Sequence, residues 1–295
     1  MDDKTVGDRL AAWAREFDPH LEALLSESPQ VSERLSEAMR YSALLPGKRV
    51  RPYLVTEVGS LLGAAPADTR PAALAIECVH AFSLIHDDLP AMDDDDLRRG
   101  KPTNHKVFGE GMAVLAGDGL LALAFEVLAT QARSPQVAAG WVAELAEATG
   151  RQGIIGGQAA DLQGETQPLD AELVGRIHRS KTARLIQSAC RLGAIAAGAS
   201  AEDYRAVSDY GLQVGLAFQM ADDLLDATSN SEALGKQTAK DTDSGKQTYV
   251  RALGVERARD LVRDKLDLAL EALARFGARA DNLRDLARFV VERDH

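Results

Sequence analysis

The chain has 295 residues, of which 45% are hydrophobic and 27% are charged, and its formal net charge is −11. This length and apolar content are sufficient to bury a large core. The acidic balance argues against nucleic acid as a partner, because binding a phosphate backbone requires a broad basic surface.

Almost every segment predicts helix, because apolar residues recur at three- to four-residue spacing among many Ala and Leu residues. In chain order the main helical segments cover residues 32–44, 71–86, 113–130, 137–150, 173–198, 208–226 and 257–277. No run of alternating β-branched residues is long enough for a central strand, and no linker or fixed-period repeat divides the chain. We therefore expect a single all-α domain over residues 1–295 with about ten helices. The polar segment from Ala227 to Tyr249 is expected to be a functional loop.

Three features indicate the compartment. The N-terminal stretch MDDKTVGDRLAAWAREFD is acidic and amphipathic, unlike a secretory signal. The most apolar window, residues 113–129, is interrupted by Asp118 and Glu126, which argues against a transmembrane segment. Cys78 and Cys190 lie far apart in helical patterns and are expected to be reduced thiols. We therefore expect a cytoplasmic protein with no transmembrane segment.

The first of two acidic clusters contains six aspartates in the ten residues from Asp87 to Asp96, and Arg98 and Arg99 follow at once. Like charges at this density repel one another unless a cation or water surrounds them. A solvated loop is the simple alternative, because charge runs usually lie in water. The apolar helical pattern that ends at Asp87 and Asp88 favours a bound cation.

The second cluster contains Asp222 and Asp226, which are four residues apart and share one face of a predicted helix. That face is otherwise apolar, so the carboxylates are unfavourable there unless they are paired or bind a metal; an exposed polar stripe is the alternative. Carboxylates without a nearby Cys favour Mg²⁺ or Mn²⁺ over zinc. An EF-hand is excluded, because Arg98 stands sixth from Asp93, where glycine is required.

Basic residues accompany the acidic ones, as phosphate groups that share a Mg²⁺ ion would require. They are Arg98, Arg99 and, in the stretch GKRVRP, Lys48, Arg49 and Arg51. A P-loop is excluded, because Gln237 and Gln247 follow the two late Gly-Lys pairs where Ser or Thr must ligate Mg²⁺.

In their order, these motifs resemble those of the trans-polyprenyl diphosphate synthases, most closely the bacterial farnesyl diphosphate synthase group and its geranylgeranyl relatives. LIHDDLPAMDDDDLRRG is similar to the family's first aspartate-rich motif in its longer form, with Pro90 and Ala91 inserted between the flanking aspartates. FQMADDLLD is similar to the second motif, and GKRVRP, GGQAADL, HRSKT and the Gly-Lys pairs follow the family's order. The resemblance covers residues 42–249 and implies an isoprenoid synthase-type helical bundle around a central apolar cavity.

The resemblance also implies a role for each matching residue. Three Mg²⁺ ions, which Mn²⁺ can replace, would be carried by Asp87, Asp93 and Asp222, with Asp88 and Asp226 in support. The allylic diphosphate would be bound by Arg98, Lys181, Lys236 and Lys246. Isopentenyl diphosphate would be bound by Gly47, Lys48, Arg51, His80 and Arg99. The residues near the reacting carbons would be Thr182 and Gln219.

Simple structural alternatives exist for several of these residues. His80 alone would more often be a core histidine, and Lys181 an exposed helical lysine. The position of both in the family motifs favours a functional role. The glycines of the GGQAADL region, Gly153, Gly156 and Gly157, are expected only to permit close helix packing.

The implied enzyme is a prenyltransferase that joins isopentenyl diphosphate head to tail (1'-4) to dimethylallyl or geranyl diphosphate. One helical turn, about 5.4 Å, is close to the length of an isoprene unit, so residues one turn before Asp87 can limit the product. Ser83 is small, and Phe82 lies about 140° from the line through Ser83 and Asp87, so spacing alone does not make Phe82 the stop. In the family, an aromatic residue there together with the two-residue insertion is associated with a C15 product. We therefore predict farnesyl diphosphate, with a C20 geranylgeranyl product as the alternative.

Other functions fit less well. A terpene cyclase would need Ser or Thr in place of Asp226 and an acid in place of Asn230. A non-catalytic subunit should have lost some of the acidic or basic ligands, and a diphosphatase would release alcohol without elongation. The resemblance implies a homodimer.

Overall fold

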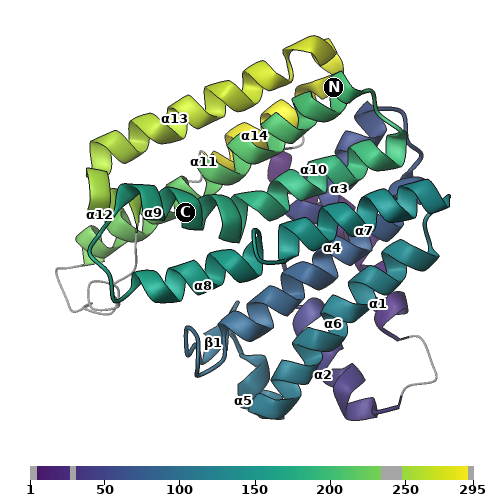
Figure 1. Cartoon of the computed structure of the whole chain (residues 1–295), viewed down its shortest axis with the longest axis horizontal. Helices are drawn as coiled ribbons and strands as arrows, with labels where there is room; N and C mark the ends of the chain where they lie inside the picture. Colours follow the sequence, from purple (N-terminus) through teal and green to yellow (C-terminus); the bar gives the residue numbers. More distant parts are fainter. Residues whose placement is uncertain (1–4, 27–30, 234–247, 292–295) are drawn as a thin grey trace.

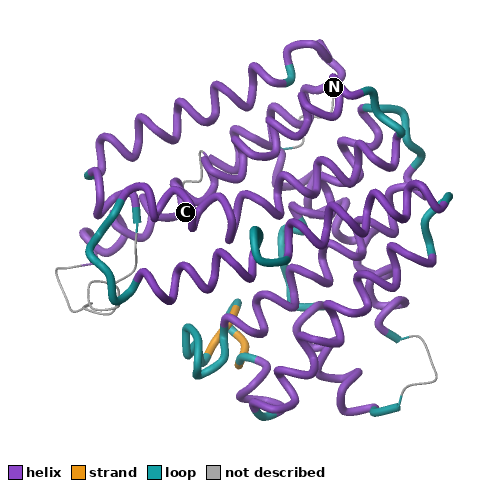
Figure 2. The backbone as a smooth tube through the Cα atoms, viewed as in Figure 1, coloured by secondary structure: helices purple, strands orange, loops and turns teal. Residues whose placement is uncertain are grey.

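The computed structural model describes residues 5–26, 31–233 and 248–291, and these are almost entirely helical (Figures 1 and 2). The first half contains α1 (Val6–Leu25), α2 (Glu33–Ala43), α3 (Val50–Leu61), α4 (Pro66–Asp87), α5 (Asn104–Phe108), α6 (Glu110–Thr130) and α7 (Pro135–Thr149). The second half contains α8 (Ile154–Gly164), α9 (Ala171–Ile177), the π-helix η1 (His178–Ala183), α10 (Arg184–Ala197), α11 (Ala201–Ala233), α12 (Tyr249–Leu253), α13 (Val255–Ala272), the 3₁₀-helix η2 (Ala274–Ala280) and α14 (Asp281–Val291). The expected all-α fold is confirmed.

The strands of the described part of the chain form one short antiparallel hairpin, shown in orange in Figure 2. Strand β1 (Leu97–Arg98) pairs with β2 (Lys101–Pro102), and Arg98 is opposite Lys101. The hairpin follows the C-terminal end of α4 and has no part in the core. It matters because it carries two of the basic residues that the sequence assigns to phosphate binding.

Helices α4 and α10 lie at the centre of the bundle (Figure 1). Helix α4 packs against α3, α6 and α10, while α10 also packs against α3, α7 and α11. Nearly every residue of α10 is buried, which agrees with a helix that is apolar on more than one face. Two buried hydrogen bonds cross between helices: Trp141 Nε1 donates to the Leu192 carbonyl at 2.9 Å, and the Tyr210 hydroxyl to the Leu283 carbonyl at 2.6 Å.

Two expectations from the sequence need correction. Residues 173–198 are not one α-helix, because η1 separates α9 from α10 and adds a wider turn at the HRSKT motif. The segment from Ala227 to Tyr249 is not a loop throughout, because α11 continues to Ala233 and α12 begins at Tyr249. The two late Gly-Lys pairs lie outside the described residues.

Helix α6 is long and apolar enough to cross a membrane by length and composition. One side of it is nevertheless buried against α4, with Ala116, Leu120 and Ala124 inaccessible to solvent. The other side carries Val114 and Leu115, which are 39% and 53% exposed. Helix α6 is therefore part of the bundle, with a partly exposed apolar side.

Candidate active site

The first acidic motif begins where α4 ends. Pro90 lacks a backbone N–H and cannot continue the helix, so the chain turns back. The Asp93 N–H donates to the Asp87 carbonyl at 2.9 Å, and Asp94 adopts a left-handed backbone with φ of 50°. The turn therefore returns the chain to Asp87, although Asp93 is six residues further along.

Electrostatic repulsion is built into this end of α4. Burial, against the opposing charge of Lys181 and helped by the charge of Asp93, raises the pKa of Asp87 to about 6. Removing a carboxylate from water beside a second carboxylate disfavours its ionised form. A cation bound here would relieve both effects.

Asp88 is held by the hairpin rather than directed at a ligand. Arg98 approaches it with two nitrogens, Nε at 2.7 Å and Nη2 at 2.6 Å from Oδ1. Asp88 is only 3% exposed, and burial raises its pKa while the bonded Arg98 opposes that shift. A buried carboxylate in such charge-assisted contact fixes the guanidinium firmly.

Arg99 is held by the loop that precedes α3. Its Nη1 donates to the Pro46 carbonyl at 2.8 Å and to the Leu45 carbonyl at 3.3 Å. The guanidinium lies directly on Gly47, where an added Cβ would be 2.5 Å from Nη1. Glycine is therefore required at position 47 if Arg99 is to remain beside the loop that precedes α3.

All five residues expected to bind isopentenyl diphosphate line one cavity of about 570 Å³. The polar lining from the motifs comprises Gly47, Lys48, Arg51, His80, Arg98, Arg99, Gln219 and Asp222. An apolar wall completes it, formed by Leu84, Ile186, Val214, Phe218 and Val290. The cavity can thus accept a diphosphate at one side and a hydrocarbon group at the other.

His80 is neutral in this cavity. Burial lowers its pKa well below the usual value, and the charges of Arg51 and Arg99 lower it further. Its Nε2 lies 3.3 Å from Arg51 Nη1. Because a guanidinium only donates, Nε2 accepts this bond and the ring proton resides on Nδ1.

The π-helix η1 supplies a second group of motif residues. Lys181 Nζ lies 2.7 Å from Asp161 Oδ2 of α8, and the Thr182 hydroxyl donates to Gln219 Oε1 of α11 at 2.7 Å. These residues line a smaller cavity of about 180 Å³ together with Asp226. Gln219 lines both cavities, so the two adjoin. Single π-turns inside helices frequently occur at functional sites.

A polyprenyl synthetase family model matches residues 32–283. The chain belongs to the polyprenyl synthetase family. Farnesyl diphosphate synthase of Escherichia coli (strain K12) is 42% identical over 294 residues, covering 97% of this chain and 98% of that protein. Geranylgeranyl pyrophosphate synthase 7 of Arabidopsis thaliana, a chloroplastic protein, is 45% identical and covers 89% of this chain and 77% of its own length.

The crystal structure of an FPP/GFPP synthase from Zymomonas mobilis has the same fold, with a TM-score of 0.87 and 39% identity over 97% of this chain and 98% of that one. The family resemblance stated from the sequence is therefore confirmed, and so is the isoprenoid synthase fold. This polyprenyl synthetase is a prenyltransferase, and its relatives support trans-prenyl diphosphate synthase activity.

The two residues expected to limit product length in this polyprenyl synthetase are buried, Phe82 at 5% and Ser83 at 9% exposure. Neither lines the two cavities described above. The Phe82 ring packs edge-on against His86 with ring centroids 4.9 Å apart, and His86 Nε2 lies 3.1 Å from the Val114 carbonyl of α6. Phe82 therefore packs beside the contact that His86 makes with α6. Lys236 and Lys246, expected at the allylic diphosphate, lie outside the described residues.

Several contacts of the site were not predicted from the sequence of this polyprenyl synthetase, which grouped Arg49 with the basic residues that accompany a phosphate. Arg49 is 5% exposed and lines the larger cavity, but it forms ion pairs with Asp18 of α1 and Glu77 of α4. A single glutamate within the apolar stretch PAALAIECVHAF was the available signal for this buried pair. Asp223 and Asp161 were also missed, and both lie against motif residues of η1 or α11.

The acidic groups fit a hard divalent ion that is shared with a substrate. Mg²⁺ typically takes one or two carboxylates and completes its shell with water and phosphate oxygens. Within the described ranges, no three His, Cys, Asp or Glu side chains converge on one metal-sized point. Asp87 and Asp93 therefore suit a site that a diphosphate completes, rather than a cage made by protein alone.

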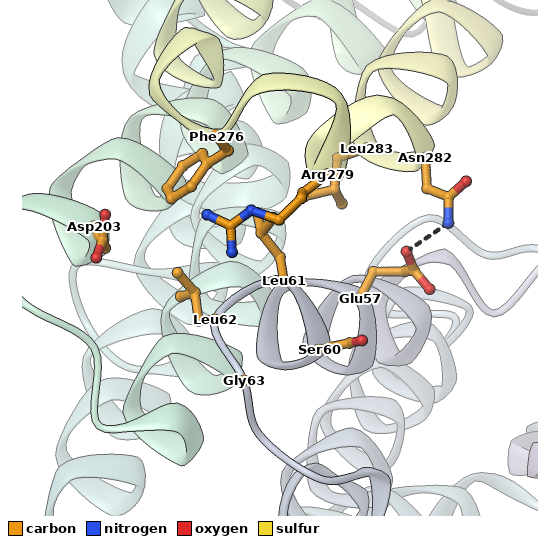
Figure 3. A pocket seen from close by; sticks show the side chains of 10 residues that line it. All are labelled: Glu57, Ser60, Leu61, Leu62, Gly63, Asp203, Phe276, Arg279, Asn282 and Leu283. Carbon is orange, nitrogen blue, oxygen red and sulfur yellow. Dashed lines mark hydrogen bonds between the residues drawn. The ribbon is translucent and has the colours of Figure 1, made fainter.

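A further cavity of about 550 Å³ lies at the C-terminal end of α3 (Figure 3). Arg279 projects between Phe276 and Leu61, and Asn282 Nδ2 donates to Glu57 Oε2 at 3.2 Å. None of the motif residues lines it. Motif residues of this polyprenyl synthetase line the two adjoining cavities instead.

Proposed function

We propose that this prenyltransferase condenses isopentenyl diphosphate head to tail (1'-4) with dimethylallyl and then geranyl diphosphate, in a Mg²⁺-dependent reaction that yields (2E,6E)-farnesyl diphosphate and diphosphate. The observation that carries the proposal is the cavity where basic residues from three segments meet an acidic residue of α11 and an apolar wall. This composition suits a substrate with a diphosphate head and a hydrocarbon tail.

Two groups of residues bind the two diphosphates in this proposal. Isopentenyl diphosphate is bound by the set Gly47, Lys48, Arg51, His80 and Arg99. The allylic diphosphate is bound by Arg98 and Lys181, with Lys236 and Lys246 as the further ligands expected from the family motifs. Lys181 already pairs with Asp161, so the incoming diphosphate competes for, or shares, a charged nitrogen that is in place.

The metal ligands are Asp87 and Asp93 from the first motif and Asp222 from the second, with Asp88 and Asp226 in support. Three Mg²⁺ ions are expected, and Mn²⁺ can replace them. When bound, the metal supplies Lewis-acid stabilisation of the departing diphosphate. Asp88 supports this site through Arg98, because its carboxylate is already engaged by that guanidinium.

The chain's own residues stabilise charge where it develops. As the allylic carbon–oxygen bond breaks, Arg98 and Lys181 donate to the diphosphate oxygens that become more negative. The isopentenyl double bond then forms the new 1'–4 bond, and the proton that is lost goes to the diphosphate leaving group. Gln219 lines both cavities and Thr182 lines the smaller one, and in this proposal both residues are near the reacting carbons. The apolar wall, including Leu84 and Phe218, excludes water that would quench the cation to an alcohol.

The C15 product is proposed from Phe82, whose buried ring packs edge-on against His86 on α4. The alternative is a C20 product, and the 45% identity to a geranylgeranyl pyrophosphate synthase supports it. Both products require the same chemistry and differ only in where the hydrocarbon tail is stopped.

A homodimer is proposed from the exposed apolar side of α6. Val114 and Leu115 on α6 are 39% and 53% exposed. Large apolar side chains gathered on one helix are typical of an interface. A cytoplasmic location and a single polyprenyl synthase domain over residues 1–295 complete the proposal.

The decisive experiment is a product-length assay. Purified protein is incubated with isopentenyl diphosphate, an allylic primer and Mg²⁺, with and without EDTA, and the hydrolysed products are separated by length. A metal-dependent C15 product supports the proposal, and a C20 product keeps the reaction but changes the product. Release of alcohol without elongation would indicate a diphosphatase, and no turnover by folded protein would indicate a non-catalytic subunit.

A further inference from the structure

A continuous series of hydrogen bonds links η1 to α11 beside the smaller cavity. The Thr182 hydroxyl donates to Gln219 Oε1 at 2.7 Å, and Gln219 Nε2 donates to Asp223 Oδ1 at 3.3 Å. The other oxygen of Asp223 accepts from the Tyr249 N–H at 3.3 Å and lies 3.3 Å from His178 Nε2. Both oxygens of Asp223 therefore have protein donors.

The direction of these bonds follows from the chemistry of the groups. A carboxylate accepts hydrogen bonds and cannot donate them, so Gln219 must turn its NH₂ group toward Asp223. Its carbonyl oxygen then faces Thr182 and accepts the one proton of the hydroxyl. The Thr182 oxygen consequently offers lone pairs, and no proton, to the cavity that both residues line.

The surroundings hold Asp223 in place. Asp223 is 7% exposed and His178 is 4% exposed, and the His178 ring packs edge-on against Tyr249 with centroids 5.1 Å apart. The three residues come from α11, η1 and α12, so the carboxylate connects separate elements. A buried acceptor with donors on both oxygens cannot rotate without losing bonds.

Hydroxyl direction matters beside a developing carbocation. Lone pairs of an oxygen stabilise positive charge, whereas a hydroxyl proton pointing at it opposes ionisation. If the carboxylate is lost, the Gln219 amide can turn over and donate to Thr182. The Thr182 proton would then point into the cavity.

We propose that Asp223 is a positioning residue, which sets the direction of the Gln219–Thr182 hydrogen bond and so presents the Thr182 oxygen to the allylic cation. The inference rests on the proposed function and gives Asp223 a role different from metal binding. It acts through Gln219 rather than on the substrate.

The test begins with Asp223→Asn, which keeps the shape and removes the obligate acceptor. We expect kcat to fall by about tenfold to a hundredfold, while KM for both substrates and the half-saturating Mg²⁺ concentration stay within about twofold. Asp226→Asn, the same change one turn later, is the matched control, and we expect it to raise the Mg²⁺ requirement. An increased Mg²⁺ requirement in Asp223→Asn would overturn the inference.

A double-mutant cycle separates positioning from a general structural effect. In a Thr182→Val background, Asp223→Asn should lower kcat by less than twofold further, because the hydroxyl that it directs is absent. Multiplicative losses would refute the inference. If Asp223→Asn does not fold, the cycle is run with Gln219→Met, which breaks the same series and leaves Asp223 bonded to His178 and Tyr249. A wild-type protein that does not elongate would refute the proposed function instead.

Discussion

Replacing Phe82 with alanine tests whether this side chain limits the product. Phe82 is 5% exposed and packs on His86, so its removal leaves a cavity beside His86. Deleting a buried phenylalanine costs about 3–5 kcal/mol of stability, which lowers Tm by roughly 5–15 °C in a domain of this size. The lost phenyl ring has six carbons and one isoprene unit has five, so the vacated space matches one further condensation. We therefore expect the main product to change from C15 to C20.

The assay separates products by chain length after incubation below the lowered Tm. Phe17→Ala is the matched control, because Phe17 on α1 is 4% exposed and stacks on Trp13 with ring centroids 4.8 Å apart. It should show a similar loss of Tm and an unchanged product. A C15 product from folded Phe82→Ala would refute the reasoning and move the stop to another residue. Equal lengthening in both variants would indicate that loosened packing, rather than position, sets the length.

Three further predictions concern the support of the site. An added Cβ at Gly157 would lie 2.5 Å from the Lys181 backbone nitrogen, so Gly157→Ala should displace η1. We expect kcat to fall by about a hundredfold in steady-state assays. An unchanged kcat would show that η1 tolerates the shift. His80 stays neutral in the folded protein, whereas in the unfolded chain it takes up a proton below a pKa of about 6.5. The free energy of unfolding therefore falls as the pH drops through that value. Between pH 7.5 and 5.5 the wild type should lose about 1.3 kcal/mol more than His80→Gln in urea unfolding, and equal losses would contradict the neutral assignment. Arg49→Met should lower the free energy of unfolding by about 3–5 kcal/mol, because it leaves Glu77 buried without its ion-pair partner. Adding Glu77→Gln should recover at least half of that loss. No recovery would show that Arg49 does not stabilise the protein through its ion pair with Glu77.

The helices were predictable because their signal is local. Apolar spacing identified the long helices, including α4 and α11, and Pro90 indicated where α4 ends. The π-helix within residues 173–198 was not predictable, because one inserted residue hardly changes a helical apolar pattern. The contact that accompanies it joins Lys181 on η1 to Asp161 on α8, which are twenty residues apart. Contacts between separate helices depend on how the helices pack, and the spacing of residues within one segment does not predict that packing.

The two adjacent-aspartate pairs show where prediction from motifs stops. Successive residues on a helix are about 100° apart, so two neighbouring carboxylates project in different directions. In the first pair Asp88 turns to Arg98, and in the second pair Asp223 turns to donors of α11, η1 and α12. Asp87 and Asp222 are left as the proposed metal ligands. In each pair, one aspartate is the proposed metal ligand and the other accepts hydrogen bonds from the protein. The sequence shows the pair, but the donors that pack against it determine which aspartate has each role.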